Sequence, residues 1–109
     1  MPIDGDKRPN TQDNVNRAPL SHGVYQLYEG PTVTYIGRAS GTAVTIRSRL
    51  QAHKGGAEGV CTRAATHFKH EETEAAIPRE EALLTEYMHE HGRLPRCNNV
   101  MPGDASHHH

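Results

Sequence analysis

The sequence predicts a small α/β fold, in which a three-stranded, mostly antiparallel sheet is flanked by helices. Two runs of strand-forming residues, within His22–Arg38, flank the turn signal Glu29-Gly30-Pro31. Two later segments carry apolar residues at helical spacing. With 109 residues, 34% hydrophobic content and no Trp, the chain has room for one domain with a thin core.

The predicted hairpin brings two tyrosines together. If Glu29-Gly30-Pro31 forms the loop, Tyr25 lies opposite Tyr35, and both phenols lie on one face of the sheet because strand side chains alternate. A tyrosine pair alone is typical of a small β core, so the pair needs further partners before it indicates a site.

The first predicted helix follows the hairpin. It covers the segment I-R-S-R-L-Q-A-H-K and is capped by Thr42 or Thr45. Arg49 and His53 are four residues apart, so they lie on one stripe of this helix, beside the apolar stripe. Taken singly, each is an ordinary residue of a helix surface.

A third strand and a second helix complete the predicted fold. We expect the strand at Thr66–Glu72 and the helix from Pro78 to His91, ended by Gly92. Glu86 falls at the edge of the apolar stripe of this helix, which is a poor position for a carboxylate unless a charged group faces it.

Both ends of the chain are predicted to lie outside the folded domain, which we place at residues 20–100. Residues 1–19 are polar and have no apolar period, so we expect a flexible arm. Residues 101–109 are expected to form a tail, in which His107–His109 resemble the start of a purification tag.

The cysteines and the hydropathy of the sequence give information about the cellular location of the protein. Cys61 and Cys97 lack C-x-x-C spacing, so they do not indicate zinc, and we expect reduced thiols. The sequence has neither an apolar run of membrane-spanning length nor the apolar core of a signal peptide. We therefore predict a cytoplasmic protein without a membrane partner.

The charge distribution is asymmetric although the net charge is −1. Residues 37–69 contain six Lys and Arg against one Glu, whereas residues 71–90 contain seven Glu against one Arg. The basic middle can collect phosphates, and an acidic run is usually a solvated helix face.

Four motifs together resemble the GIY-YIG nuclease superfamily. The first is the pair G-V-Y at 23–25 and Y-I-G at 35–37, and the others are R-L-x-x-H at 49–53, E-A-L-L-x-E at 81–86 and P-x-C-N at 95–98. Their order matches the family, and they span about Leu20 to Asn99. Val24 replaces the Ile of the family name, and the loop at 39–44 is slightly long.

The resemblance implies a metal-dependent endonuclease that hydrolyses DNA phosphodiester bonds. Tyr25 would be the general base and Tyr35 would orient the nucleophile. A phenol with a pKa near 10 is a poor base at neutral pH, so Arg49 and His53 must favour its ionised form. Arg49 would also neutralise the phosphate.

The resemblance further implies one divalent ion, Mg²⁺ or Mn²⁺, held by Glu86. This carboxylate lies twelve residues before Asn98, the spacing of the family motifs. Asn98 would fix the local backbone. Water and substrate oxygens would complete the coordination of the ion.

The expected partner is nucleic acid, contacted by Arg38, Arg47 and Lys54. A non-cleaving nucleic-acid-binding module on the same scaffold is the alternative, as is a nuclease that is active only with a partner. The sequence does not decide whether the substrate is DNA or RNA, or whether it is single-stranded, duplex or branched. It also leaves open whether a protein partner or an oligomer selects the substrate.

Overall fold

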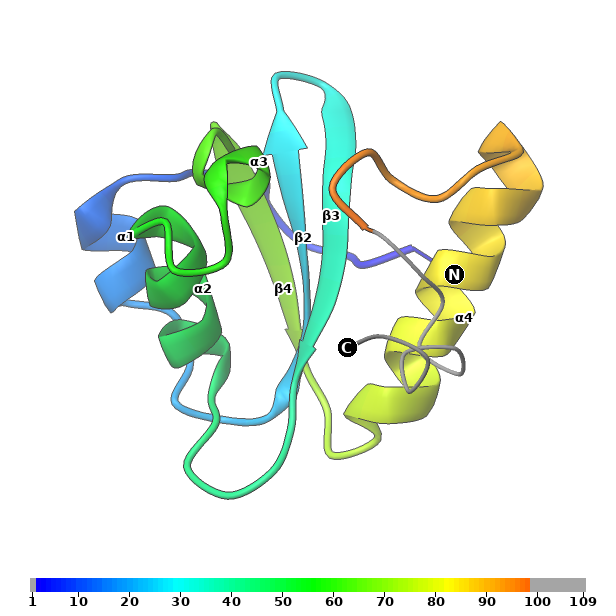
Figure 1. The fold of residues 1–109 in the computed structure, drawn as a ribbon. Coiled ribbons are helices and arrows are strands. Elements are labelled where there is room, and N and C mark those ends of the chain that lie inside the picture. Colours follow the sequence, from blue (N-terminus) through cyan, green and yellow to red (C-terminus); the bar gives the residue numbers. More distant parts are fainter. Residues whose placement is uncertain (1, 99–109) are drawn as a thin grey trace.

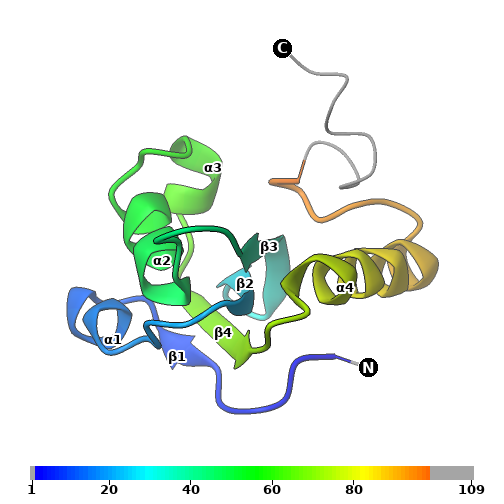
Figure 2. The ribbon, with the colours of Figure 1, turned by 90° about the horizontal axis from the view of Figure 1, so that it is seen from below.

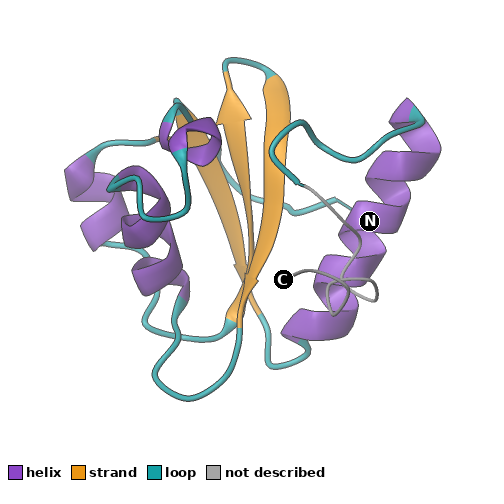
Figure 3. Cartoon of the chain, in the orientation of Figure 1, coloured by secondary structure: helices purple, strands orange, loops and turns teal. Residues whose placement is uncertain are grey.

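The computed structural model of the protein describes residues 2–98 and confirms the α/β class (Figure 3). The chain forms, in order, β1 (Arg8–Pro9), α1 (Gln12–Asn16), β2 (Gly23–Glu29), β3 (Thr32–Ala39), α2 (Ile46–Lys54), α3 (Val60–Arg63), β4 (His67–Glu72) and α4 (Ala76–His91). The predicted tail at 101–109 lies outside the described residues.

The sheet has four strands rather than the three that the sequence predicts. Their order is β1-β4-β2-β3, and every pair is antiparallel. The additional strand, β1, is two residues long and pairs Arg8 with Phe68 of β4. A strand this short shows no alternation in the sequence, and its Pro9 suits an edge position.

Helices cover both faces of the sheet (Figures 1 and 2): α1, α2 and α3 lie on one side and α4 lies on the other. Alternation along the central strand β2 divides its side chains between two apolar clusters. Tyr25 and Leu27 belong to the cluster under α1 and α2, and Val24 belongs to the cluster under α4. Tyr25 therefore faces α2, as does Tyr35, which packs against the same cluster.

The structure differs from the expectation of a flexible arm at residues 1–19. Val15 of α1 is fully buried and Ala18 is 2% exposed, both in the cluster under α2. Ile3 is 2% exposed and packs in the cluster under α4. A long polar stretch separates Ile3 from Val15, so the sequence shows no apolar period there, yet all three side chains are buried in the core.

The helix predictions are confirmed to within two residues. Thr45 caps α2 with its side-chain oxygen, and Gly55 ends the helix. The second long helix begins at Ala76, two residues before the predicted start, and ends at Gly92 with φ of 73°. Glycine reaches this left-handed conformation without steric cost.

The expectation of reduced cysteines is wrong in this structure, because Cys61 and Cys97 form a disulfide with their Cα atoms 5.7 Å apart. The bond joins α3 to the segment after α4, two parts of the chain that the sequence gives no reason to bring together. Disulfides are rare in cytosolic proteins, so the cytoplasmic location stays a prediction that this bond does not support.

No helix within residues 2–98 is long and apolar enough to cross a membrane.

Candidate active site

The hairpin places both tyrosines on the face that α2 covers. The strands pair Tyr25 with Gly37 and Leu27 with Tyr35, and the register shifts after Leu27. The predicted direct pairing of Tyr25 with Tyr35 is therefore wrong, because the loop contains only Gly30 and Pro31 and a bulge follows. The tyrosines are diagonal neighbours instead, with ring centroids 6.1 Å apart.

Gly37 makes room for the ring of Tyr25. A Cβ atom at this position would lie 2.5 Å from the hydroxyl oxygen of Tyr25 and 2.6 Å from the ring of Tyr35. Real Cβ atoms do not approach other atoms so closely, so the site requires glycine here. The glycine of the Y-I-G motif thus has a steric role, because its missing side chain leaves space for the two phenols.

Helix α2 contributes Arg49 and His53 to the same site. Nε2 of His53 lies 2.8 Å from the hydroxyl of Tyr25, and the imidazole ring is 4.9 Å from the ring of Tyr35. The positive charge of Arg49 acts to lower the pKa of Tyr25, and Nη1 of Arg49 forms an ion pair with Oε2 of Glu58 at 3.4 Å. The structure therefore brings four of the sequence-predicted site residues together.

The electrostatics of the phenols follow from their burial. Tyr25 is 1% exposed, and burial, together with the neighbouring ionisable phenol of Tyr35, raises its pKa above the usual 10.0, while Arg49 acts to lower it. Burial and the positive charge of Arg49 lower the pKa of His53 from 6.5 to about 4. His53 is therefore a neutral imidazole at neutral pH.

Helix α4 brings a carboxylate, Glu80, to this site. Glu80 is 7% exposed, and one of its oxygens lies 2.7 Å from Nη1 of Arg38. Burial raises the pKa of Glu80, and the ion pair with Arg38 opposes that change. The negative charge of Glu80 also raises the pKa of Tyr25 and of Tyr35.

These side chains line a pocket of about 330 Å³. Its walls are formed by the two phenols, two arginines, one carboxylate and two residues of the loop after β3, namely Tyr25, Tyr35, Arg38, Arg49, Glu80, Ser40 and Val44. The pocket combines a buried phenol, positive charge and a single carboxylate.

Glu86 does not line this pocket. It lines a different one, on the α4 side of the sheet, together with Tyr28 and Val33. Glu80 is the carboxylate that sequence reasoning missed. The signal was present, because Glu80 precedes Leu83 and Leu84 by three and four residues and so shares their buried helix face.

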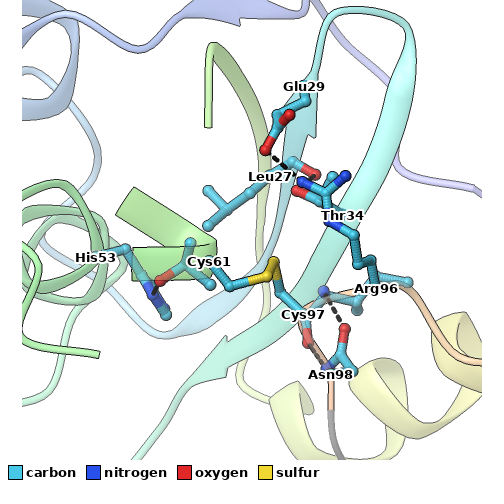
Figure 4. Close-up of a disulfide and its surroundings, with 10 residues drawn as sticks. Leu27, Glu29, Thr34, His53, Cys61, Arg96, Cys97 and Asn98 are labelled. Atoms are coloured by element: carbon cyan, nitrogen blue, oxygen red, sulfur yellow. Dashed lines mark hydrogen bonds and ion pairs between the residues drawn. A yellow bond between two sulfur atoms is a disulfide. The ribbon is translucent and has the colours of Figure 1, made fainter. Parts of the chain in front are cut away.

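Asn98 supports the outer edge of β3. Its side-chain oxygen accepts a hydrogen bond from the amide of Ile36, and its amide donates to the carbonyl of Ile36, both at 2.9 Å. The amide of Cys97 also donates to the carbonyl of Thr34 at 2.7 Å. In Figure 4 the disulfide lies between His53 on one side and Asn98 on the other.

Arg47 and Lys54 of α2 are occupied by the N-terminal segment. Arg47 donates to the carbonyl of Ala18 at 2.8 Å, and Lys54 donates to the carbonyl of Asn10 at 2.9 Å. Neither lines the pocket, whereas Arg38 does.

The possible metal ligands in the pocket fit a divalent ion that keeps most of its coordinating water molecules. Within residues 2–98, no three His, Cys, Asp or Glu side chains are grouped to form a metal cage. Mg²⁺ commonly binds through one or two carboxylates, with waters and phosphate oxygens as its other ligands. Glu80 supplies one such carboxylate, and only one of its oxygens is engaged by Arg38.

Comparison with known proteins supports the fold. No family model matches the sequence, and no curated protein matches it. A solved structure matches with a TM-score of 0.58 and 17% identity, over 82% of this chain and 94% of that one. It is the GIY-YIG N-terminal endonuclease domain of UvrC from Thermotoga maritima, a point mutant bound to its catalytic divalent cation. The chain therefore shares the fold of a GIY-YIG endonuclease domain.

Proposed function

We propose that this protein is a metal-dependent nuclease that hydrolyses phosphodiester bonds, with DNA as its substrate. The observation that carries the proposal is the pocket in which the buried phenol of Tyr25, contacted by His53, opens toward Arg49 and the buried carboxylate of Glu80. The shared fold with an endonuclease domain is consistent with it.

Tyr25 would take the proton from the attacking water. Two effects on the pKa of Tyr25 oppose each other: burial raises it, and the positive charge of Arg49 lowers it. Neutralising the charge of Glu80 would remove one further contribution that raises this pKa. Arg49 would attract the substrate phosphate, and Tyr35, in the same pocket, would orient the water.

Glu80 would hold the divalent ion, in place of the Glu86 that the motif spacing predicts. When bound, the ion would supply positive charge beside the phosphate and the leaving oxygen. Arg38 favours the ionised form of Glu80, which metal binding requires. Arg38 and Arg49 are the basic residues that line the pocket, so the proposal assigns the phosphate contacts to them rather than to Arg47 and Lys54.

The two glutamates of α4 provide a matched test. Supercoiled plasmid and labelled oligonucleotides of DNA and RNA would be incubated with the protein in Mg²⁺, Mn²⁺ or EDTA. We expect cleavage in the metal ions and none in EDTA. Glu80→Gln should reduce the cleavage rate by at least about 10²-fold, while Glu86→Gln should cut at the wild-type rate.

Two results would contradict parts of this proposal. Loss of activity in Glu86→Gln but not in Glu80→Gln would return the metal site to the residue that the sequence motif indicates. Absence of cleavage of any substrate by the wild-type protein, with DNA binding retained, would favour the non-cleaving binding module.

A further inference from the structure

His53 lies between two buried hydroxyl groups. Its Nε2 atom is 2.8 Å from the hydroxyl of Tyr25, and its Nδ1 atom is 2.8 Å from Oγ1 of Thr62 in α3. Exposure is 1% for Tyr25, 2% for His53 and 3% for Thr62. The proposed function uses Tyr25 and His53 but gives Thr62 no role.

A neutral imidazole carries one donor and one acceptor nitrogen. Because burial and Arg49 keep His53 neutral, the ring must donate to one hydroxyl and accept from the other. In one arrangement Thr62 donates to Nδ1 and Nε2–H donates to Tyr25. In the other, Nδ1–H donates to Thr62 and Tyr25 donates to Nε2.

The hydrogen of the Thr62 hydroxyl distinguishes these arrangements. Among the residues that the structure describes, His53 is the hydrogen-bond partner of this hydroxyl. If Nδ1 were the donor, the hydrogen of Thr62 would be buried without an acceptor, which is unfavourable. If Thr62 donates to Nδ1, its hydrogen is bonded and Nε2 carries the ring proton toward Tyr25.

We propose that Thr62 is a positioning residue that holds His53 in the tautomer whose Nε2–H donates to Tyr25. The phenolic oxygen then accepts from His53 and faces the positive charge of Arg49, and its own hydrogen is left for the pocket. Both groups stabilise the phenolate. The benefit to catalysis rests on the proposed function, whereas the tautomer itself does not.

The position of Thr62 depends on the disulfide. Helix α3 has only four residues and no side-chain cap. Cys61, directly before Thr62, is bonded to Cys97, and the next residue, Asn98, is hydrogen-bonded to the main chain of Ile36. The hydroxyl that orients His53 is thus linked to the edge of β3 through the disulfide and the hydrogen bonds of Cys97 and Asn98.

The ring nitrogens of His53 report the tautomer directly. Nitrogen-15 spectra of the wild-type protein near neutral pH should show Nε2 bearing the hydrogen and Nδ1 as an acceptor. Thr62→Val keeps the shape of the side chain but removes the donor, so the Nδ1 signal should shift and the tautomers should mix. Thr62→Ser should restore the wild-type signals. Thr85→Val, at an exposed position of α4, is the matched control.

Cleavage rates give the second readout. Single-turnover cleavage should fall about tenfold in Thr62→Val, the factor that corresponds to one hydrogen bond, and should recover in Thr62→Ser. Wild-type protein with the hydrogen on Nδ1 would overturn the proposal, as would a Thr62→Val spectrum identical to wild type. If Thr62→Val does not fold, the wild-type and Thr62→Ser spectra still decide the tautomer. If the wild-type protein cleaves nothing, the spectra test the tautomer independently.

Discussion

At the scale of single residues, the site depends on close contacts between a few atoms. Gly37 leaves space for the ring of Tyr25, and His53 forms a hydrogen bond with the hydroxyl of Tyr25. Tyr25 therefore combines burial, which raises its pKa, with neighbours that can stabilise its ionised form. This combination is what a tyrosine base requires, and it can be tested by removing one oxygen atom.

Tyr25→Phe should reduce the single-turnover cleavage rate by roughly 10²–10⁴-fold, the contribution of a general base. Below its pKa, the ionised fraction of Tyr25 increases about tenfold for each pH unit. The wild-type rate should therefore rise with pH between about 7 and 9, and the variant should lose this slope. The free energy of unfolding should fall by about 1–3 kcal/mol, because the variant leaves the buried Nε2 of His53 without its hydrogen-bond partner.

Tyr28→Phe is the control for this experiment. Tyr28 lies on the same strand, 8% exposed, and its hydroxyl donates to Gln26 at 3.0 Å, but it does not line the pocket. It should lose similar stability and no activity. A folded Tyr25→Phe protein that cuts at the wild-type rate would remove Tyr25 from the chemistry.

At the scale of elements, three of the parts that build the site have different kinds of support. The hairpin β2–β3 is held by its pairing, and α2 is held by its cap and its buried face. Helix α3 is too short to be stable by its own hydrogen bonds. It is fixed instead by the bond between Cys61 and Cys97.

Removing the disulfide should lower the free energy of unfolding. The two cysteines are 36 residues apart, and closing a loop of this length reduces the entropy of the unfolded chain by an amount worth about 4 kcal/mol. Denaturant unfolding of the Cys61→Ser, Cys97→Ser double variant should show this loss. Wild-type protein in reductant should behave similarly, and equal stability with and without reductant would mean that the bond does not form in solution.

At the scale of the whole molecule, the N-terminal segment completes the core on both faces of the sheet. Ile3 packs under α4, and Val15 packs under α2. Arg47 and Lys54, whose charges suggest phosphate contacts, hold the carbonyls of this segment. The basic surface available to nucleic acid is therefore smaller than the sequence alone indicates.

Val15→Ala should measure this contribution. Val15 is fully buried, so the substitution should cost about 1.5–3 kcal/mol of unfolding free energy, from lost apolar burial and the cavity that remains. The same substitution at Val60, which is 83% exposed, should change stability by less than about 0.5 kcal/mol. Equal effects at the two positions would indicate that the N-terminal segment is detached in solution, as the sequence suggests.

Local sequence signals suffice to predict the α/β class and, within two residues, both long helices and the third predicted strand. These elements are specified locally: Thr45 and Gly55 delimit α2, Gly92 ends α4, and strand-forming residues on both sides of a turn signal mark the hairpin. Spacing also brought Arg49 and His53 onto one helix stripe, and the structure places that stripe over the tyrosines.

Long-range packing sets the register of the hairpin, the edge strand β1, the disulfide and the carboxylate that faces the tyrosines. The first three depend on contacts between residues far apart in the chain, which leave no local period. Counting residues back from Asn98 selects Glu86, but which face of α4 meets the pocket is set by the packing of Leu83 and Leu84 against the sheet. That packing turns Glu80, and not Glu86, toward Arg38 and the buried phenols, because a helix presents only one face to a sheet.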